Sequence, residues 1–344
     1  MALCRTLAAL LLVTIFLLHS AHADQIVLKN GDRLTGKVVS KKGDTLKYRT
    51  EYAGEIKVRW KDVVSITTDE PVTVMSADGK LEKVRLERAA AGAAKLVSEG
   101  KSLDVPLADL AHINPPPHVS GTGVTYRGRA QILASASRGN TVDDGLYVEA
   151  ALTARAKPYR YSIDGRVERT SEAGVTTAEN TLFNANYDRF LDKDRFAYVR
   201  ASTETDEFKD IKFRGTVGAG MGWDVLDTEK IELVLRGDLD YVITSRNNSD
   251  PQLGDSKNYP ALGWGINYRH WLWPDRLELF HDQQGFMNVN DTQDITLRTR
   301  TGVRLPIASG LSANAQLNWD YDADVPPDTS KSDTKILLGL GYEF

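Results

Sequence analysis

Long stretches in which apolar and polar residues alternate fill most of the sequence after residue 122. In 231–243, one set of alternate positions reads Ile, Leu, Leu, Gly, Leu, Tyr, Ile, and the other reads Glu, Val, Arg, Asp, Asp, Val. The segment 311–321 repeats this pattern, with Leu, Ala, Trp and Tyr on one set and Ser, Asn, Gln and Asp on the other. Because successive side chains of a strand point to opposite faces, these segments predict strands with one apolar and one polar face.

The length of these strands separates two all-β architectures. We predict about twelve strands, at 123–137, 143–156, 159–170, 177–188, 194–206, 211–225, 230–245, 257–272, 275–288, 293–306, 311–322 and 332–344. Strands of soluble proteins are mostly about 5 to 6 residues long, whereas a tilted strand that crosses a bilayer needs about 9 to 11. The pattern therefore favours a transmembrane antiparallel β-barrel over 123–344. It disfavours a soluble sandwich, in which the apolar faces of two sheets pack together.

The connections between the predicted strands alternate in length. Those at 156–159, 190–194, 226–229, 273–275 and 308–310 are short, whereas others, such as 246–258 and 323–333, are long and acidic. Outer-membrane barrels have short periplasmic turns and long external loops. An even number of strands returns both ends of the barrel to the same side, so the residues before the barrel are expected in the periplasm.

The first 23 residues have the pattern of a secretory signal peptide. Arg5 precedes an apolar stretch over 7–18, and 21–23 (Ala-His-Ala) fits a cleavage site. The mature chain is expected to begin near Asp24, outside the cytoplasm, and the only cysteine, Cys4, would be removed with the leader. An exported chain without disulfides needs a large core or a closed hydrogen-bond network.

Charge and hydropathy exclude two classes of protein. The net charge is −4, from 43 basic and 47 acidic residues, so the chain lacks the basic signature of a nucleic-acid-binding protein. A mean hydropathy of −0.35, with no long apolar run after the leader, excludes membrane-spanning helices. A barrel strand presents only alternate residues to lipid, so a barrel is compatible with this hydropathy.

An internal repeat occupies the residues before the barrel. Residues 25–36 and 72–83 each alternate like a strand, pass through an Asn-Gly-Asp or Ala-Asp-Gly turn, and continue as a second strand. Gly31 and Gly79 lie at the same place in the two copies, 48 positions apart.

The two copies also end alike. Residues 61–66 and 108–113 correspond at a spacing of 47. We therefore predict a duplicated SH3-like or Sm-like β-module over 24–113, followed by a proline-containing linker over 114–122. The alternative is a single sandwich with two hairpin-rich segments that look alike by chance.

The final predicted strand ends on an aromatic residue. Counting back by twos from Phe344 gives Tyr342 and then three aliphatic residues, while the other face holds mostly small or charged residues. If this strand pairs with the first one to close the barrel, its apolar face lies against lipid. Phe344 is then expected in the interfacial aromatic girdle.

Several segments between 120 and 344 resemble one family. They are 137–141 (SRGNT), 194–202 (DRFAYVRAS), the glycine-rich 218–223 (GAGMGW) and the closing stretch 321–344. With these segments the chain resembles a domain-of-unknown-function family of salt-induced or acid-inducible outer-membrane proteins. The N-terminal repeat lies outside the similarity.

The resemblance implies a cell outer-membrane location and a role in the envelope response to salt or acid. A last strand that ends Tyr342-Glu-Phe344 also resembles the signal that the barrel-assembly machinery recognises. The family has no established catalytic residues, so the resemblance implies none here.

The polar faces of the predicted strands carry charges of both signs. Opposite the apolar face we place Arg127, Arg129, Arg155, Arg160, Asp164, Arg166, Glu168, Glu232, Arg236, Asp238, Asp240, Arg298, Arg300 and Arg304. Buried charges need partners, so these residues imply either a wet channel or a network of ion pairs across the barrel. A barrel of about twelve strands is intermediate between filled eight-stranded barrels and open porins. The arginines therefore either line a narrow pore or close it.

Motifs for a metal or a cofactor are weak. Asp320, Asp322 and Asp324 have the spacing of a calcium loop, but Val325 and Lys331 stand where an EF-hand needs glycine and glutamate. We expect no metal site and no cofactor. Loose binding of divalent cations by the acidic loops is the alternative.

The glycines at 218, 220 and 222 imitate a nucleotide-binding fingerprint. They alternate within a predicted strand, and no helix follows them, so we expect them to free space on the inner face or to let the barrel bend.

An outer-membrane lipid hydrolase would need a Ser, His and Asn or Asp constellation at the outer leaflet. His270 falls near the short turns, and His281 lies in mid-strand without a matching serine signature. We expect no catalytic residues and no enzyme, with lipid hydrolysis as an alternative.

Two other functions remain open. In one, the charged lumen conducts small solutes or ions. In the other, the barrel is sealed and anchors the N-terminal module, which binds peptidoglycan or a periplasmic partner. In both cases outer-membrane lipid and lipopolysaccharide surround the barrel, and no nucleic acid is expected.

Overall fold

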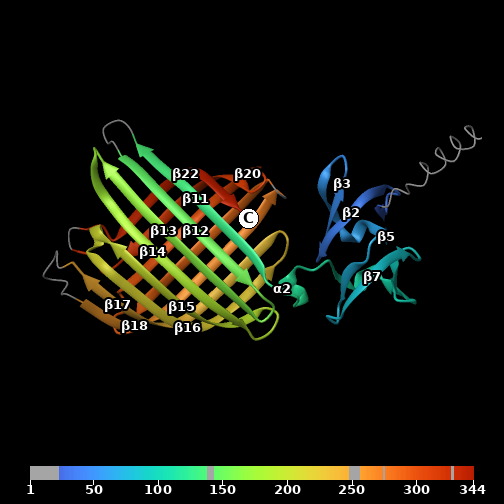
Figure 1. Cartoon of the computed structure of the whole chain (residues 1–344). Coiled ribbons are helices and arrows are strands. Elements are labelled where there is room, and N and C mark those ends of the chain that lie inside the picture. The colour runs from blue at the N-terminus through green and yellow to red at the C-terminus, as the bar shows by residue number, and fades with distance from the viewer. Residues whose placement is uncertain (1–22, 138–142, 248–255, 274–275, 327–328) are drawn as a thin grey trace, which may run out of the picture. The chain divides into compact units, whose positions relative to one another are not determined.

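The computed structural model describes residues 23–137, 143–247, 256–273, 276–326 and 329–344 (Figure 1). The predicted signal peptide, except for its last residue, lies outside the described residues, as does most of the family-like segment 137–141. The chain forms two compact units, one ending at Pro115 and one beginning at Pro116. No helix in the described ranges is long and apolar enough to cross a membrane.

The first unit is an antiparallel sheet of ten strands in two similar halves. The first half holds β1 (Asp24–Leu28), β2 (Arg33–Lys42), β3 (Thr45–Thr50), β4 (Gly54–Arg59), the 3₁₀ helix η1 (Trp60–Asp62) and β5 (Val63–Thr67). The second half has the same order, with β6 (Val72–Ser76), β7 (Leu81–Arg88), β8 (Ala93–Ser98), β9 (Lys101–Pro106), η2 (Leu107–Asp109) and β10 (Leu110–Ile113). Pairing of β2 with β10 joins the halves.

The turns after β1 and β6 share one backbone conformation. Gly31 and Gly79 have φ of 88° and 83°, in the left-handed region that side chains rarely adopt. In each turn a side-chain oxygen, of Asn30 or Asp78, accepts a hydrogen bond from the backbone N–H two residues later, at 3.1 and 3.3 Å. The repeat in the sequence is thus also a repeat in local structure.

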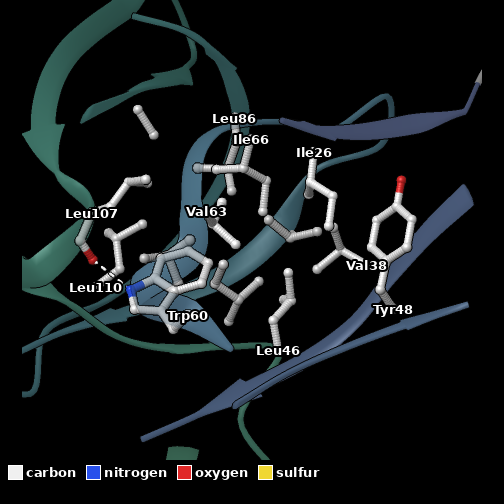
Figure 2. Packing of buried hydrophobic residues seen from close by; sticks show 14 of the residues in the cluster. Ile26, Val38, Leu46, Tyr48, Trp60, Val63, Ile66, Leu86, Leu107 and Leu110 are labelled. Atoms are coloured by element: carbon white, nitrogen blue, oxygen red, sulfur yellow. Dashed lines mark hydrogen bonds between the residues drawn. The ribbon is translucent and has the colours of Figure 1, made fainter. Parts of the chain in front are cut away.

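One apolar core fills the first unit and takes residues from both halves (Figure 2). It includes Ile26, Leu46 and Ile66 from the first half and Leu86, Leu110 and Ile113 from the second, all at 0% exposure. Trp60 packs into this core, and its indole Nε1 donates a 3.0 Å hydrogen bond to the carbonyl oxygen of Leu107, drawn dashed in Figure 2. The two halves therefore share a single core.

Lys41 is a charged residue inside this unit. It is 5% exposed, and its Nζ donates to the carbonyl oxygens of Leu110 and Ala111, the latter at 3.0 Å. The same Nζ lies 5.2 Å from the ring centroid of Trp60. Burial lowers the pKa of Lys41, and the charge of nearby Asp44 partly opposes this shift. These contacts fasten β2 to β10 where the halves meet.

The second unit is a closed barrel of twelve antiparallel strands (Figure 1). After the short helix α2 (Pro117–Ser120), the strands are β11 (Thr125–Ser137), β12 (Asp143–Arg155), β13 (Tyr159–Glu172), β14 (Val175–Phe190), β15 (Arg195–Asp206), β16 (Ile211–Asp227), β17 (Ile231–Arg246), β18 (Ser256–Trp273), β19 (Leu277–Asn288), β20 (Ile295–Ala308), β21 (Leu311–Asp322) and β22 (Ser332–Glu343), with η3 (Glu207–Lys209) between β15 and β16. Each strand pairs with the next, and β22 pairs with β11. The predicted all-β fold class, a closed antiparallel barrel after an N-terminal antiparallel sheet, is confirmed.

The closing pair of strands brings the end of the sequence against β11. Tyr342 is the register partner of Ala130. Phe344 continues the pairing: its N–H donates to the Gly128 carbonyl at 3.0 Å, and its carbonyl accepts from the Gly128 N–H at 2.9 Å. A Cβ on Gly128 would overlap the Phe344 ring, so glycine makes room for that ring. Tyr342 and Phe344 point outward, with exposures of 51% and 69%.

The connection predicted over 171–176 is shorter in the structure. β13 continues to Glu172, and β14 begins at Val175. Ala173 and Gly174 between them have φ of 49° and 85°, the left-handed conformation of a two-residue hairpin turn. A tight turn therefore lies among the longer loops. We call that end of the barrel the long-loop mouth and the opposite end, where Thr228 to Lys230 joins β16 to β17, the short-turn mouth.

Candidate functional site in the barrel lumen

Each barrel strand sends alternate side chains into the lumen. The predicted lumen residues lie at these inward positions: Arg127, Arg129, Arg155, Arg160, Asp164, Arg166, Glu168, Glu232, Arg236, Asp238, Asp240, Arg298, Arg300 and Arg304. Most of them belong to clusters of ion pairs that follow one another along the barrel axis.

Near the long-loop mouth, ion pairs join opposite walls of the barrel. Glu204 of β15 pairs with Arg298 of β20 and with Arg214 of β16, the latter at 3.4 Å. Arg214 also pairs with Asp322 of β21 at 2.5 Å. In the circle of twelve strands, β15 and β20 are five strands apart, as are β16 and β21. Guanidinium groups therefore cross the lumen at this level.

In the middle of the barrel, Glu149 of β12 forms ion pairs with two arginines on different strands. Arg129 on the neighbouring β11 lies at 2.8 Å, and Arg300 on β20, four strands away, lies at 2.6 Å. The Tyr147 hydroxyl donates a further 2.8 Å hydrogen bond to this carboxylate. The Glu149 side chain is 2% exposed, and a carboxylate at such burial requires partners of this kind.

Toward the short-turn mouth, Asp188 of β14 holds two arginines. Arg160 lies at 2.6 Å and Arg236, three strands away on β17, at 3.2 Å. Arg160 also reaches Asp224 of β16 at 3.3 Å. The guanidinium groups of Arg160 and Arg236 lie 4.8 and 5.2 Å from the ring centroid of Phe196, whose π face attracts cations.

A further cluster is packed against glycines. Arg200 pairs with Asp238 at 3.1 Å and with Asp240. A Cβ on Gly218 would overlap Asp240, and one on Gly263 would overlap Asp238. Glycine at these inward positions of β16 and β18 leaves space for the two carboxylates. Gly218, in the glycine-rich segment of β16, therefore has a packing role in the lumen, as the sequence predicted.

The aspartates with the spacing of a calcium loop belong to the same network. Asp320 pairs with Arg166 at 3.4 Å, Asp322 with Arg214 at 2.5 Å, and Asp324 with Arg246 at 2.7 Å. Their carboxylates thus neutralise arginines. Within the ranges that the structure describes, no group of three or more His, Cys, Asp or Glu residues is placed to hold a metal ion.

Two predicted lumen residues make other contacts. The Arg155 guanidinium stacks on the Phe190 ring, 3.3 Å from its centroid, and Asp164 accepts a 2.8 Å hydrogen bond from Asn184. Glu168 and Arg304 pair with Lys335 and Glu278, respectively.

A cavity of about 150 Å³ opens at the short-turn mouth. It is lined by Arg127, Thr228, Glu229, Lys230, Glu232, Arg269, Trp271, Glu278 and Glu343. The ion pairs of Glu232 here are looser than those farther inside, at 3.6 Å from Arg127 and 3.8 Å from Arg269, whereas Glu278 makes a close pair with Arg304. Glu232 is therefore more loosely paired at this mouth than the carboxylates of the clusters beyond it.

Sequence reasoning did not single out the partners of the predicted arginines. The missed acidic partners include Glu149, Asp188 and Glu204, and two further lumen arginines, Arg200 and Arg214, were also missed. Each lies on the inward parity of its own strand, so the alternation that revealed the arginines contained the signal for these residues as well.

Both barrel histidines lie on the outer face. His270 Nδ1 lies 3.1 Å from the Tyr268 hydroxyl, and His281 Nδ1 lies 2.8 Å from the Thr301 hydroxyl. Nδ1 of each histidine thus contacts a neighbouring side chain of the barrel wall.

Fold and lumen together define the second unit as a closed β-barrel with an apolar exterior and a charged interior. Residues 130–344, more than half of the chain, match the family described as "Protein of unknown function, DUF481". The chain belongs to this family.

Several solved structures are similar to the chain. One is a NanC porin, at 11% identity and a TM-score of 0.40, covering 63% of this chain and 98% of the porin. Another is an outer membrane channel from Pseudomonas putida F1, at 12% identity and a TM-score of 0.41, covering 64% of this chain and 96% of the channel. A third is the translocator domain of the autotransporter NalP from Neisseria meningitidis, at 14% identity and a TM-score of 0.36, covering 65% of this chain and 89% of that domain. The curated proteins contain no match.

Proposed function

We propose that this protein is an outer-membrane β-barrel whose narrow, charged lumen conducts small solutes or ions when its ion pairs open. The outer face of the barrel supports the membrane location. Leu338, Val217 and Leu239, on three different strands, are 61%, 65% and 67% exposed. Soluble monomers rarely expose a continuous apolar surface of this kind. The strands, from 12 residues in β15 to 18 in β18, are also long enough to cross a tilted bilayer.

The observation that carries the proposed channel is the pairing of charges across the lumen. Glu204 and Arg298 belong to strands five positions apart, and charges of both signs fill the space between the walls. These pairs are side-chain contacts, so they can separate while the main-chain hydrogen bonds of the wall stay intact. We infer a closed resting barrel with a wet vestibule, the cavity at the short-turn mouth.

The same ion pairs favour a second function, a sealed barrel that anchors the N-terminal module. That module has its own core and forms a separate compact unit. In this proposal the module binds peptidoglycan or a periplasmic partner. Deleting residues 24–113 should then remove the cellular phenotype while the barrel still assembles, and an unchanged phenotype would count against anchoring.

The cellular setting is part of the proposal. With an even number of strands, the N-terminal module lies on the periplasmic side, together with the short-turn mouth. Outer-membrane lipid and lipopolysaccharide surround the wall, and the barrel-assembly machinery recognises the strand that ends at Tyr342 and Phe344. The envelope response to salt or acid, implied by the family resemblance, is the process in which we place the protein.

We also propose that the protein is not an enzyme. A lipid hydrolase of the outer membrane would use a histidine next to a serine nucleophile. The neighbours of His270 and His281 are instead the hydroxyls of Tyr268 and Thr301.

Planar-bilayer recordings test the channel. The wild type should show small, infrequent conductance steps, and Glu204→Gln should open more often, because Arg298 then loses its charged partner on the opposite wall. Glu179→Gln, at an exposed outward position of β14, is the control and should behave like the wild type. A complete lack of conductance in folded wild type and Glu204→Gln alike would contradict the channel and leave the anchor.

A further inference from the structure

The outer wall formed by β18, β19 and β20 differs from the rest of the barrel exterior. Outward positions in the middle of β19 and β20 hold polar side chains: His281 and Gln283 on β19, and Thr299 and Thr301 on β20. On β18, Tyr268 lies beside His281, whereas the apolar Ile266 lies beside Gln283. The outward positions near the middle of other strands are apolar, for example Val199, Val217, Leu239 and Leu338.

Strand register makes these residues one continuous patch. His281 lies between Tyr268 and Thr301, its register partners on the two neighbouring strands. Gln283, two residues farther along, lies opposite Thr299. We call Tyr268, His281, Gln283, Thr299 and Thr301 the polar wall patch.

The patch has hydrogen-bonding groups that the chain itself leaves unused. His281 Nδ1 is engaged with the Thr301 hydroxyl at 2.8 Å, so Nε2, on the far side of the ring, is left for another contact. Among the described residues, no hydrogen bond reaches the half-buried Gln283 amide. The Thr299 hydroxyl has none either, but it is buried within the wall and is not offered to the surface. Polar groups facing hydrocarbon without partners are costly.

The depth of the patch excludes lipid headgroups as the partner. Gln283 lies six residues from the start of β19 at the short-turn mouth, which is about 15 Å along the barrel axis for a strand tilted by about 40°. The apolar band of such barrels is about 25 Å tall, so Gln283 lies near its middle. Lipid acyl chains offer no donors or acceptors there.

We propose that the polar wall patch is the contact between two copies of this chain, arranged about a twofold axis along the membrane normal. This inference rests on the proposed location in a membrane. A second copy inserted in the same orientation carries the same groups at the same depth, and a twofold axis places like residues opposite each other. An amide is both donor and acceptor, so Gln283 can pair with Gln283 of the second copy. His281 Nε2 can pair in the same way with a hydroxyl or an amide across the interface.

Disulfide cross-linking tests the proposal in native membranes. In a Cys4→Ser background, which removes the only cysteine, Gln283→Cys should give a product of twice the monomer mass under mild oxidation. Val217→Cys, near the middle of β16 on another wall, is the matched control and should give little product. Equal cross-linking of both variants, or none at Gln283→Cys in a folded barrel, would overturn the dimer. A product of any other mass would assign the patch to a different protein and overturn it as well.

Gln283→Leu provides a second measurement that needs no cross-link. Light scattering of the detergent-solubilised protein should give a dimer for the wild type and for Val217→Leu, and at least a tenfold weaker dimer for Gln283→Leu. Heat-modifiable gel migration of each variant shows whether the barrel is folded in the membrane. Folded monomers throughout would therefore contradict the dimer alone, whereas loss of membrane insertion would contradict the proposed function.

Discussion

Trp60 and Leu107 occupy the same position in the two halves of the N-terminal unit and contact each other. Each is the first residue of a 3₁₀ helix, η1 or η2, and 47 positions separate them. The Trp60 indole donates its hydrogen bond to the Leu107 carbonyl at 3.0 Å. Residues at equivalent positions of the two halves, although different in type, therefore contact each other and hold the halves together.

Trp60→Phe is expected to weaken the contact between the two halves while it keeps most of the core packing. The phenyl ring keeps most of the packing, but the Leu107 carbonyl loses its donor, at a cost of about 1 kcal/mol. Hydrogen exchange measured by mass spectrometry should become roughly five-fold faster in β5 and β10. Tyr52→Phe, at a 96% exposed side chain, is the control. Unchanged exchange in Trp60→Phe would show that this hydrogen bond does not stabilise the unit.

The pair of Glu149 and Arg300 should show strong coupling. Removing Arg300 leaves the buried Glu149 with Arg129 alone, and removing Glu149 takes the shared carboxylate from both arginines, so each single change should cost up to about 3–5 kcal/mol. Glu149→Gln combined with Arg300→Met should cost less than the sum of the two single changes. The temperature at which the barrel loses its folded gel mobility measures each step of this cycle. Additive effects would mean that the two charges do not interact across the lumen.

Gly263→Ala is expected to destabilise the barrel by about 1–3 kcal/mol, because its Cβ would overlap the Asp238 carboxylate. Gly237→Ala is the matched control. A Cβ at Gly237 meets nothing within 4 Å, so its effect should be small. Both variants are compared by the same thermal gel assay. Equal effects would indicate that any side chain added at a glycine of these strands destabilises the barrel, and that the overlap with the carboxylate is not the cause.

Phe344→Ala should reduce the amount of assembled barrel in cells. The substitution keeps the main-chain hydrogen bonds to Gly128 but removes the ring that lies over it. Leu338→Ala removes a similarly exposed apolar side chain from the same strand and is the control. The yield of heat-modifiable protein, relative to total protein, is the measurement. Equal yields in the two variants would argue against a special role of Phe344 in assembly.

The strands of the barrel were predictable because lipid and lumen impose a strict period of two. The strand predicted at 311–322 is β21 with the same bounds, and the other predicted strands differ from the structure by a few residues. The largest difference, around Ala173 and Gly174, arose because 169–172 and 176–177 are polar on both faces, so the alternation ends before the strands do.

The ion-pair partners could not be predicted in the same way. Alternation gives the face on which a residue lies, but not which side chain stands opposite across a closed barrel. Arg298 and Glu204 are 94 residues apart in sequence and meet only because the circle of strands closes between β11 and β22. The polar wall patch was missed for a related reason, since its residues come from three strands and form a group only through their register.

The membrane location of the barrel is tested most directly by gel migration of the cell membrane fraction with and without heating. We predict that the protein is found in the outer-membrane fraction and migrates faster before heating than after it, as a closed barrel that resists the detergent. Recovery of the protein in the soluble fraction, with one mobility under both conditions, would contradict a barrel embedded in lipid.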